Sequence, residues 1–105
     1  MALNYKLHAP AANAAADLSG HFLRGNESLA AGDYRQAEEC YLQVLAASPD
    51  LAEAHNNLGV ALKRQQQFDN AGIAFQRAVA ARPDFVDAYA NLGDTLRQLN
   101  RLDEA

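Results

Sequence analysis

A repeat of 34 residues runs through most of this sequence and constrains its fold more than any other feature. Several sets of residues share the spacing: Gly25, Gly59 and Gly93; Tyr34, Phe68 and Leu102; Ala37, Ala71 and Ala105; Pro49 and Pro83. The repeat divides the chain into a leader, residues 1–17, two complete units, residues 18–51 and 52–85, and an incomplete third unit, residues 86–105. Units of this length bury their apolar sides against their neighbours in a stack.

Each unit is predicted to form two helices. The apolar residues of the second unit recur at helical spacing in two runs. The first run is Ala54, Leu58, Ala61 and Leu62, and the second is Phe68, Ala71, Phe75, Ala78 and Val79. The expected fold is therefore all-α, with about two and a half helical hairpins and a leader that is irregular or partly helical.

The helix boundaries are predicted from proline, acidic and glutamine residues. Pro49 stops the preceding helix, since proline disfavours helix in the residue before it. Asp50 is then expected to cap the next helix, with Glu53 as its capping-box partner. Residues 65–67, three glutamines, are expected to end that helix, and by the same period the second helix of the third unit should begin at Leu102.

Two glycines lie inside predicted helices, where glycine costs about 1 kcal/mol relative to alanine. They are Gly59 and Gly93, at equivalent places of the second and third units. Close packing of the second helix at Ala71 and Ala105 is expected to offset this cost.

These residues resemble the tetratricopeptide repeat, whose pattern is an aromatic residue, Leu-Gly, a large residue, Ala, an aromatic residue and Pro. The second unit carries His55, Leu58, Gly59, Leu62, Ala71, Phe75 and Pro83, and the third carries Tyr89, Leu92, Gly93, Leu96 and Ala105. The first carries His21, Gly25, Ala37, Tyr41 and Pro49, and departs from the pattern at Arg24 and Ser28. The resemblance covers residues 18–105 and implies a right-handed superhelix of helical hairpins, an α-solenoid.

Segments 52–63 and 87–105 are most similar to the repeats of bacterial proteins related to O-linked N-acetylglucosamine transferases, the Spindly-like proteins. In those proteins long arrays are joined to a glycosyltransferase domain. Two functions follow from the resemblance: a scaffold that binds a protein or an extended peptide, and the N-terminal repeat region of such a transferase. A self-assembling module is a third possibility, because the third unit is incomplete and its open end could pack on another copy.

The family resemblance also implies where a peptide would bind, along the inner face of the first helix of each unit. The residues that fall there are Phe22, Asn26, Glu53, Asn56, Asn57, Val60, Lys63, Arg64, Asp87, Asn91, Asp94 and Arg97. Their charges are expected to separate, with Glu53, Asp87 and Asp94 toward one edge and Lys63, Arg64 and Arg97 toward the other.

Asn57 and Asn91 are the main candidates for holding a ligand. A side-chain amide offers both a donor and an acceptor, so it can bind a peptide main chain without reading its side chains. Their places look like the asparagine ladder of the transferase superhelix, which Leu23 interrupts in the first unit. The alternative is that both amides only join neighbouring helices.

Some family members clamp the C-terminal carboxylate of chaperone peptides with lysine, asparagine and arginine. Asn26 and Asn57 fit that pattern, but Phe22, Asp87 and Asn91 stand where the clamp needs basic residues. Because Asp87 would repel a carboxylate, we do not expect this chain to bind such tails.

Composition argues against several other classes of function. The net charge is −4, and no cluster of Lys and Arg exists for binding nucleic acid. No apolar run of 18 residues predicts a transmembrane helix, and nothing near the N-terminus reads as a signal peptide. A cytoplasmic setting without membrane partners is expected.

The sequence contains no catalytic or metal-binding pattern. Cys40 is the single cysteine, which excludes an intrachain disulfide and a site built on several thiolates. His21 and His55 are one unit apart, too far to share a metal, and are expected to pack. No P-loop, dinucleotide fingerprint or zinc-protease motif occurs. We therefore expect no cofactor, no metal and no enzyme activity in this chain itself.

The third unit has a first helix but only the start of a second. Its apolar residues Leu92, Leu96 and Leu99 would then lack a cover. We expect the chain either to self-associate through residues 86–105 or to fray there.

Overall fold

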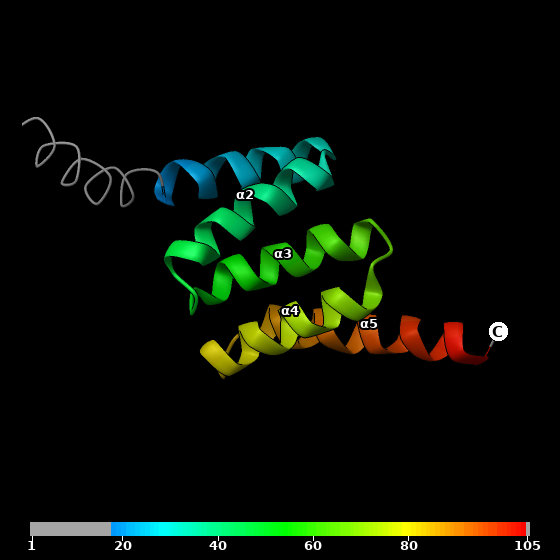
Figure 1. Ribbon diagram of the computed structural model, residues 1–105. Helices are drawn as coiled ribbons and strands as arrows, with labels where there is room; N and C mark the ends of the chain where they lie inside the picture. Colours follow the sequence, from blue (N-terminus) through cyan, green and yellow to red (C-terminus); the bar gives the residue numbers. More distant parts are fainter. Residues whose placement is uncertain (1–17, 105) are drawn as a thin grey trace, which may run out of the picture.

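The computed structural model describes residues 18–104, and these form five helices and no strand (Figure 1). The first helix spans residues 18–31. It is followed by α2 (Tyr34–Ala47), α3 (Ala52–Arg64), α4 (Phe68–Ala81) and α5 (Val86–Glu104). The all-α fold of stacked hairpins is confirmed. Residues 1–17 and Ala105 lie outside the described residues, so the expectation for the leader is not tested.

The helices stack so that the first helix of each unit lies on one side. The backbones of α3 and α5 approach within 8 Å, and an Asn26–Asn57 hydrogen bond joins helix 18–31 to α3. In contrast, the backbones of α2 and α4 stay more than 8 Å apart. Because the first helices lie closer together than the second helices, the stack curves toward the first helices. We call the side formed by helix 18–31, α3 and α5 the inner face.

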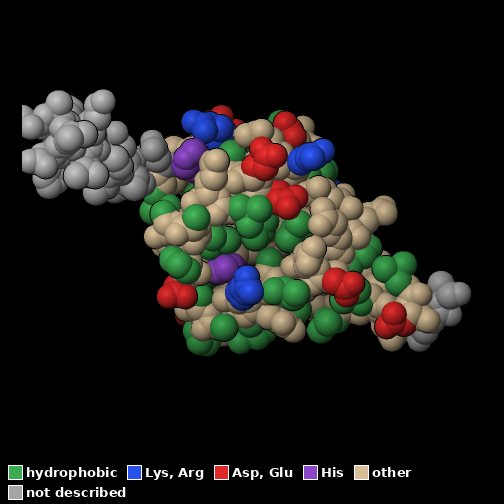
Figure 2. All heavy atoms as spheres, viewed as in Figure 1, with side chains coloured by type: hydrophobic (Ala, Val, Ile, Leu, Met, Phe, Trp, Pro, Cys, Tyr) green, Lys and Arg blue, Asp and Glu red, His purple; other side chains and the backbone are tan. Residues whose placement is uncertain are grey.

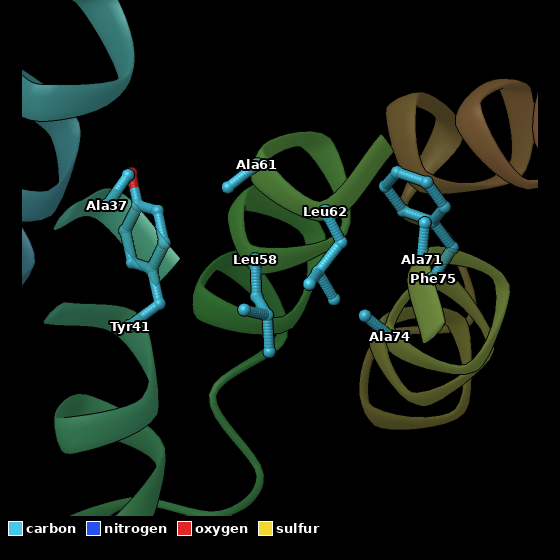
Figure 3. Close-up of a cluster of buried hydrophobic side chains, with 8 residues drawn as sticks. All are labelled: Ala37, Tyr41, Leu58, Ala61, Leu62, Ala71, Ala74 and Phe75. Carbon is cyan, nitrogen blue, oxygen red and sulfur yellow. The ribbon is translucent and has the colours of Figure 1, made fainter. Parts of the chain in front are cut away.

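The core fills the space between α2, α3 and α4 (Figure 3). Its members are Ala37, Tyr41, Leu58, Ala61, Leu62, Ala71, Ala74 and Phe75, all of them buried. The two apolar runs predicted for the second unit supply most of this cluster. The two aromatic rings are the largest side chains that are completely enclosed, and the alanines between them let the helices approach closely.

At two of the helical glycines, Gly25 and Gly59, the nearest side chain is an aromatic ring of the facing helix. A Cβ atom on Gly59 would lie 2.5 Å from Cε1 of Phe75, and one on Gly25 would lie 2.8 Å from Cε1 of Tyr41. Both distances are too short for real atoms, so each ring lies directly on the backbone of the facing helix. At Gly93 a Cβ atom would meet no described atom within 4 Å.

The capping prediction for α3 was wrong. Its N-cap is Leu51, and no side chain caps it. Asp50 lies one residue too early, inside a turn in which Leu51 N donates to Ser48 O at 3.3 Å. Glu53 instead contacts Arg82, at 3.2 Å. A side-chain cap does occur at α2, where Asp33 accepts a hydrogen bond from the main-chain nitrogen of Gln36.

The glutamine run ends α3 as predicted. Gln65 is the C-cap, and Gln66 has a φ of 63°, in the left-handed region. The Gln65 side chain bridges the hairpins, because its Nε2 donates to Glu38 Oε1 at 2.9 Å and to Ala61 O at 3.1 Å.

The equivalent turn in the third unit is absent, so the prediction of a new helix at Leu102 was wrong. The helix α5 continues without interruption through residues 99–101. In the second unit the turn is held by Phe75 and its neighbours, which pack α4 back onto α3. Residues 102–104 supply no counterpart of that packing, and helix formers such as Leu99 and Arg101 keep the backbone helical.

Candidate functional site

A hydrogen-bonded cluster joins the first two units on the inner face. Asn57 Nδ2 donates to Asn26 Oδ1 at 3.1 Å, and the Tyr41 hydroxyl donates to the same oxygen at 2.6 Å. Burial raises the pKa of Tyr41 to about 12, against a smaller lowering by the Asn57 amide. The Asn57 amide therefore faces neighbouring helices, as in the alternative considered for it.

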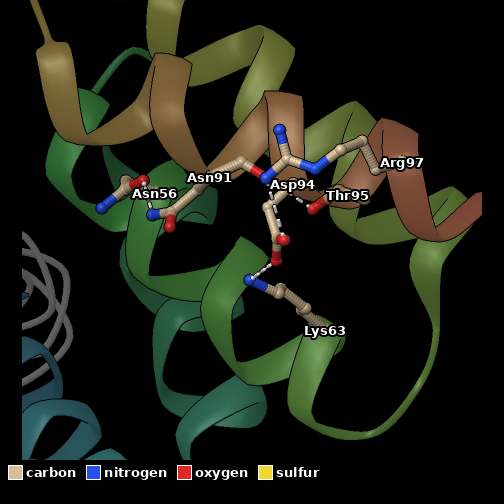
Figure 4. A network of polar contacts seen from close by, with 6 residues as sticks. All are labelled: Asn56, Lys63, Asn91, Asp94, Thr95 and Arg97. Carbon is tan, nitrogen blue, oxygen red and sulfur yellow. Dashed lines mark hydrogen bonds and ion pairs between the residues drawn. The ribbon is translucent and has the colours of Figure 1, made fainter.

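A second amide pair joins the second and third units (Figure 4). Asn91 Nδ2 donates to Asn56 Oδ1 at 3.0 Å. Asn56 is buried, whereas Asn91 is partly exposed. The remaining amide atoms, Asn56 Nδ2 and Asn91 Oδ1, make no hydrogen bond with residues 18–104 and point away from the bond that joins the pair. The pair thus keeps one donor and one acceptor without a partner among residues 18–104.

An ion-pair network lies next to this amide pair on α3 and α5. Lys63 Nζ contacts Asp94 Oδ2, and Arg97 Nη2 contacts Asp94 Oδ1 at 3.3 Å (Figure 4). The hydrogen bond from Lys63 is the main cause that lowers the pKa of Asp94. The predicted separation of charges does not hold here, because Asp94 lies between the two basic side chains.

Two apolar members of the predicted set support the inner face. The Phe22 ring packs edge-on against Tyr41, with ring centroids 6.0 Å apart. Val60 is partly buried against the core cluster. Phe22 also lines a small hollow of about 390 Å³, together with Leu18, Leu23 and Leu51.

Three predicted residues lie apart from the amide and ion-pair networks. Arg64 lies over the Tyr34 ring of α2, 5.9 Å from its centroid. Glu53 pairs with Arg82 beyond the end of α4. Asp87 is exposed in the first turn of α5 and has no ion pair with any described residue.

The partners of the amides could not be found from the repeat. Asn26 is equivalent to Val60 and Asp94, so no asparagine recurs at its place. The bonded pairs are 31 and 35 residues apart, Asn26 with Asn57 and Asn56 with Asn91. The period relates equivalent residues, whereas contacts between neighbouring units join residues that are not equivalent.

Residues 18–104 contain no group of three or more His, Cys, Asp and Glu side chains that could hold a metal. Among them no helix is both long and apolar enough to cross a membrane. Cys40 is a buried free thiol. His55 is buried, and its Nε2 donates to Pro49 O at 2.6 Å.

Comparisons with known proteins agree with this architecture. The TPR2B domain of yeast Sti1, in its pHsp70 complex, superposes with a TM-score of 0.78 at 22% identity, over 84% of this chain and 70% of that one. The first TPR of Spaghetti (RPAP3), bound to the HSP90 peptide SRMEEVD, gives 0.76 at 26% identity, over 84% of this chain and 72% of that one. A mutant of the Thermobaculum terrenum O-GlcNAc transferase gives 0.74 at 29% identity, over 79% of this chain and 16% of that one. No curated protein sequence matches significantly.

Family models give the most direct result. A model described as tetratricopeptide repeat matches residues 22–84, and a second model with the same description matches residues 74–105. The first match alone spans more than half of the sequence. The chain belongs to the tetratricopeptide-repeat family.

Proposed function

We propose that this chain is a scaffold that binds an extended polypeptide along its inner face, mainly through the ligand's main chain. The observation that carries this proposal is the Asn56–Asn91 pair. Its bond fixes both amides, and it leaves Asn56 Nδ2 as a donor and Asn91 Oδ1 as an acceptor. A peptide unit in an extended segment presents the complementary N–H and C=O groups.

The surroundings favour a ligand without a terminal carboxylate at this place. Lys63 and Arg97 already face Asp94, so neither is a free cation. Asp87 is exposed without an ion pair among residues 18–104, and its charge repels anions. Two of the similar structures are complexes with a chaperone partner or peptide. They support peptide binding as a class of function, and the local charges argue against the same ligand.

A selection experiment tests the proposal. A random peptide library displayed on phage is selected on the immobilised full chain, and the best peptide is titrated by calorimetry. Asn56→Ala/Asn91→Ala should weaken binding by about 0.5–1.5 kcal/mol for each hydrogen bond lost. The matched control Gln43→Ala/Gln76→Ala removes two exposed amides from the second helices and should bind normally.

A single Asn57→Ala variant separates the two amide sites. The Asn57 amide is engaged by Asn26, so its loss should lower stability more than affinity. If the Asn56/Asn91 double variant, with its helicity retained, binds every selected peptide as tightly as the wild type does, the main-chain proposal is wrong.

Two further roles are also proposals. The chain could be the repeat region of a glycosyltransferase, an idea supported by the 29% identity to the transferase, of which it spans 16%. It could also self-associate through the exposed apolar side chains of α5, Val86, Tyr89, Leu96 and Leu102. The buried free thiol of Cys40 fits the cytoplasmic setting that we propose for all three roles.

A further inference from the structure

A second surface lies on the opposite side of the stack, between α2 and α4. The backbones of these two helices stay more than 8 Å apart, and α3 forms the floor between them. The resulting outer groove has two connected parts, of about 710 Å³ and 240 Å³, which share Leu42, His55, Leu58 and Arg77. Figure 2 shows this side, where hydrophobic side chains surround a histidine and a basic side chain.

The outer groove exposes large apolar side chains on both walls. Leu42 of α2 is 49% exposed, and Ile73 of α4 is 46% exposed. Leu45 and Leu58 continue the apolar lining between them. Side chains of this kind on facing walls form a continuous apolar surface that a partner could bury.

Two polar groups in the outer groove lack partners. Arg77 makes no ion pair or hydrogen bond with any of residues 18–104. His55 is only 6% exposed, and its Nε2 must carry the hydrogen that binds Pro49 O. With that hydrogen on Nε2, Nδ1 can act as an acceptor, and it is the one buried side-chain nitrogen or oxygen of residues 18–104 without a hydrogen-bond partner.

We propose that the outer groove binds a peptide segment that presents leucine-like side chains around one carboxylate. The apolar side chains would cover Leu42 and Ile73, and the carboxylate would pair with Arg77. An arginine fork matches a carboxylate with two parallel hydrogen bonds. This surface and its ligand are separate from the inner face.

The acidic side chains near the outer groove limit how many carboxylates a ligand can carry. Glu38, which lines one part of the outer groove, is already engaged by Gln65 at 2.9 Å. Asp50 lines the other part and would repel further carboxylates at that end. A ligand with one carboxylate at Arg77 and apolar groups elsewhere therefore fits better than a strongly acidic segment.

The test uses a designed probe. A fluorescein-labelled peptide with blocked ends, Ser-Leu-Leu-Asp-Leu-Leu-Ser, is compared by anisotropy with its analogue carrying Asn for Asp. The Asp peptide should bind the full chain about three- to tenfold more tightly. Arg77→Gln should remove that preference, while Arg101→Gln, which loses the same charge on α5 outside the groove lining, should retain it.

Further variants check the rest of the surface. Leu42→Ser and Ile73→Ser, at exposed positions, should weaken the binding of both peptides alike. Equal affinity for the two peptides, a preference that survives Arg77→Gln, or no binding of the Asp peptide at millimolar concentration would each overturn the proposal. Asn56→Ala/Asn91→Ala should leave this binding unchanged, which separates the result from the test of the inner face.

Discussion

At the scale of single residues, Gly59 and Gly93 have the same place in the repeat but different surroundings. The Phe75 ring lies on the backbone at Gly59, whereas no described atom lies within 4 Å of a Cβ at Gly93. Gly59→Ala should therefore destabilise the protein by about 1–3 kcal/mol, because the ring must move. Gly93→Ala should instead stabilise it by up to about 1 kcal/mol, through helix propensity. Urea unfolding measures both, and effects of the same sign would contradict this account of the contact.

Tyr41 gives a prediction at high pH. Its pKa is raised from 10.0 to about 12 by burial. Below pH 10 the hydroxyl is neutral in both states, but between pH 10 and 12 the unfolded chain loses this proton first. The free energy of unfolding should then fall as the pH rises. Tyr41→Phe should show a weaker fall when unfolding is measured at pH 9 and 11, and an unchanged fall would mean that Tyr41 is not its source.

At the scale of the elements, α5 is one continuous helix where the repeat predicts a turn. The carbon chemical shifts of residues 98–101 should therefore be helical in solution. Residues 65–67, at the equivalent place, should have non-helical shifts and serve as an internal reference. Non-helical shifts at residues 99–101 would contradict the continuous helix and support the helix end that the 34-residue repeat predicts.

Some of the contacts that define these helices can be predicted from the sequence, and others cannot. Gly25 and Gly59 mark tight helical contacts, and their spacing is visible in the sequence, although the facing residues are Tyr41 and Phe75. The start of α3 was wrongly predicted at Asp50, because a turn that ends at Leu51 moves the start of the helix one residue further on.

The inner face was predicted as a set of residues, but its bonds were not. Asn26, Asn56 and Asn57 all belong to the predicted set. Which amide meets which depends on the rotation between neighbouring units, and that rotation arises from packing across the whole interface. The same rotation brings Asp94 between Lys63 and Arg97, although the helix ends suggested separate charges.

At the scale of the whole molecule, the exposed apolar side of α5 gives a prediction about mass. Val86 is 75% exposed, and Leu96 and Leu102 are about half exposed. Burying each leucine fully stabilises an interface by roughly 1.5–3 kcal/mol. Analytical ultracentrifugation should show a mass that rises above 11.4 kDa with concentration. Leu96→Glu/Leu102→Glu should remain monomeric, and a wild type that stays monomeric at millimolar concentration would contradict self-association through α5.

Peptide binding along the inner face is the central claim, and its most direct test is a nuclear magnetic resonance titration with the library-selected peptide. The account predicts that the side-chain amide signals of Asn56 and Asn91 shift with saturation, together with main-chain signals of α3 and α5 near Lys63 and Asp94. The signals of Gln43 and Gln76 on the second helices should stay in place. If every peptide selected from the library binds without shifting the Asn56 and Asn91 signals, the claim is contradicted.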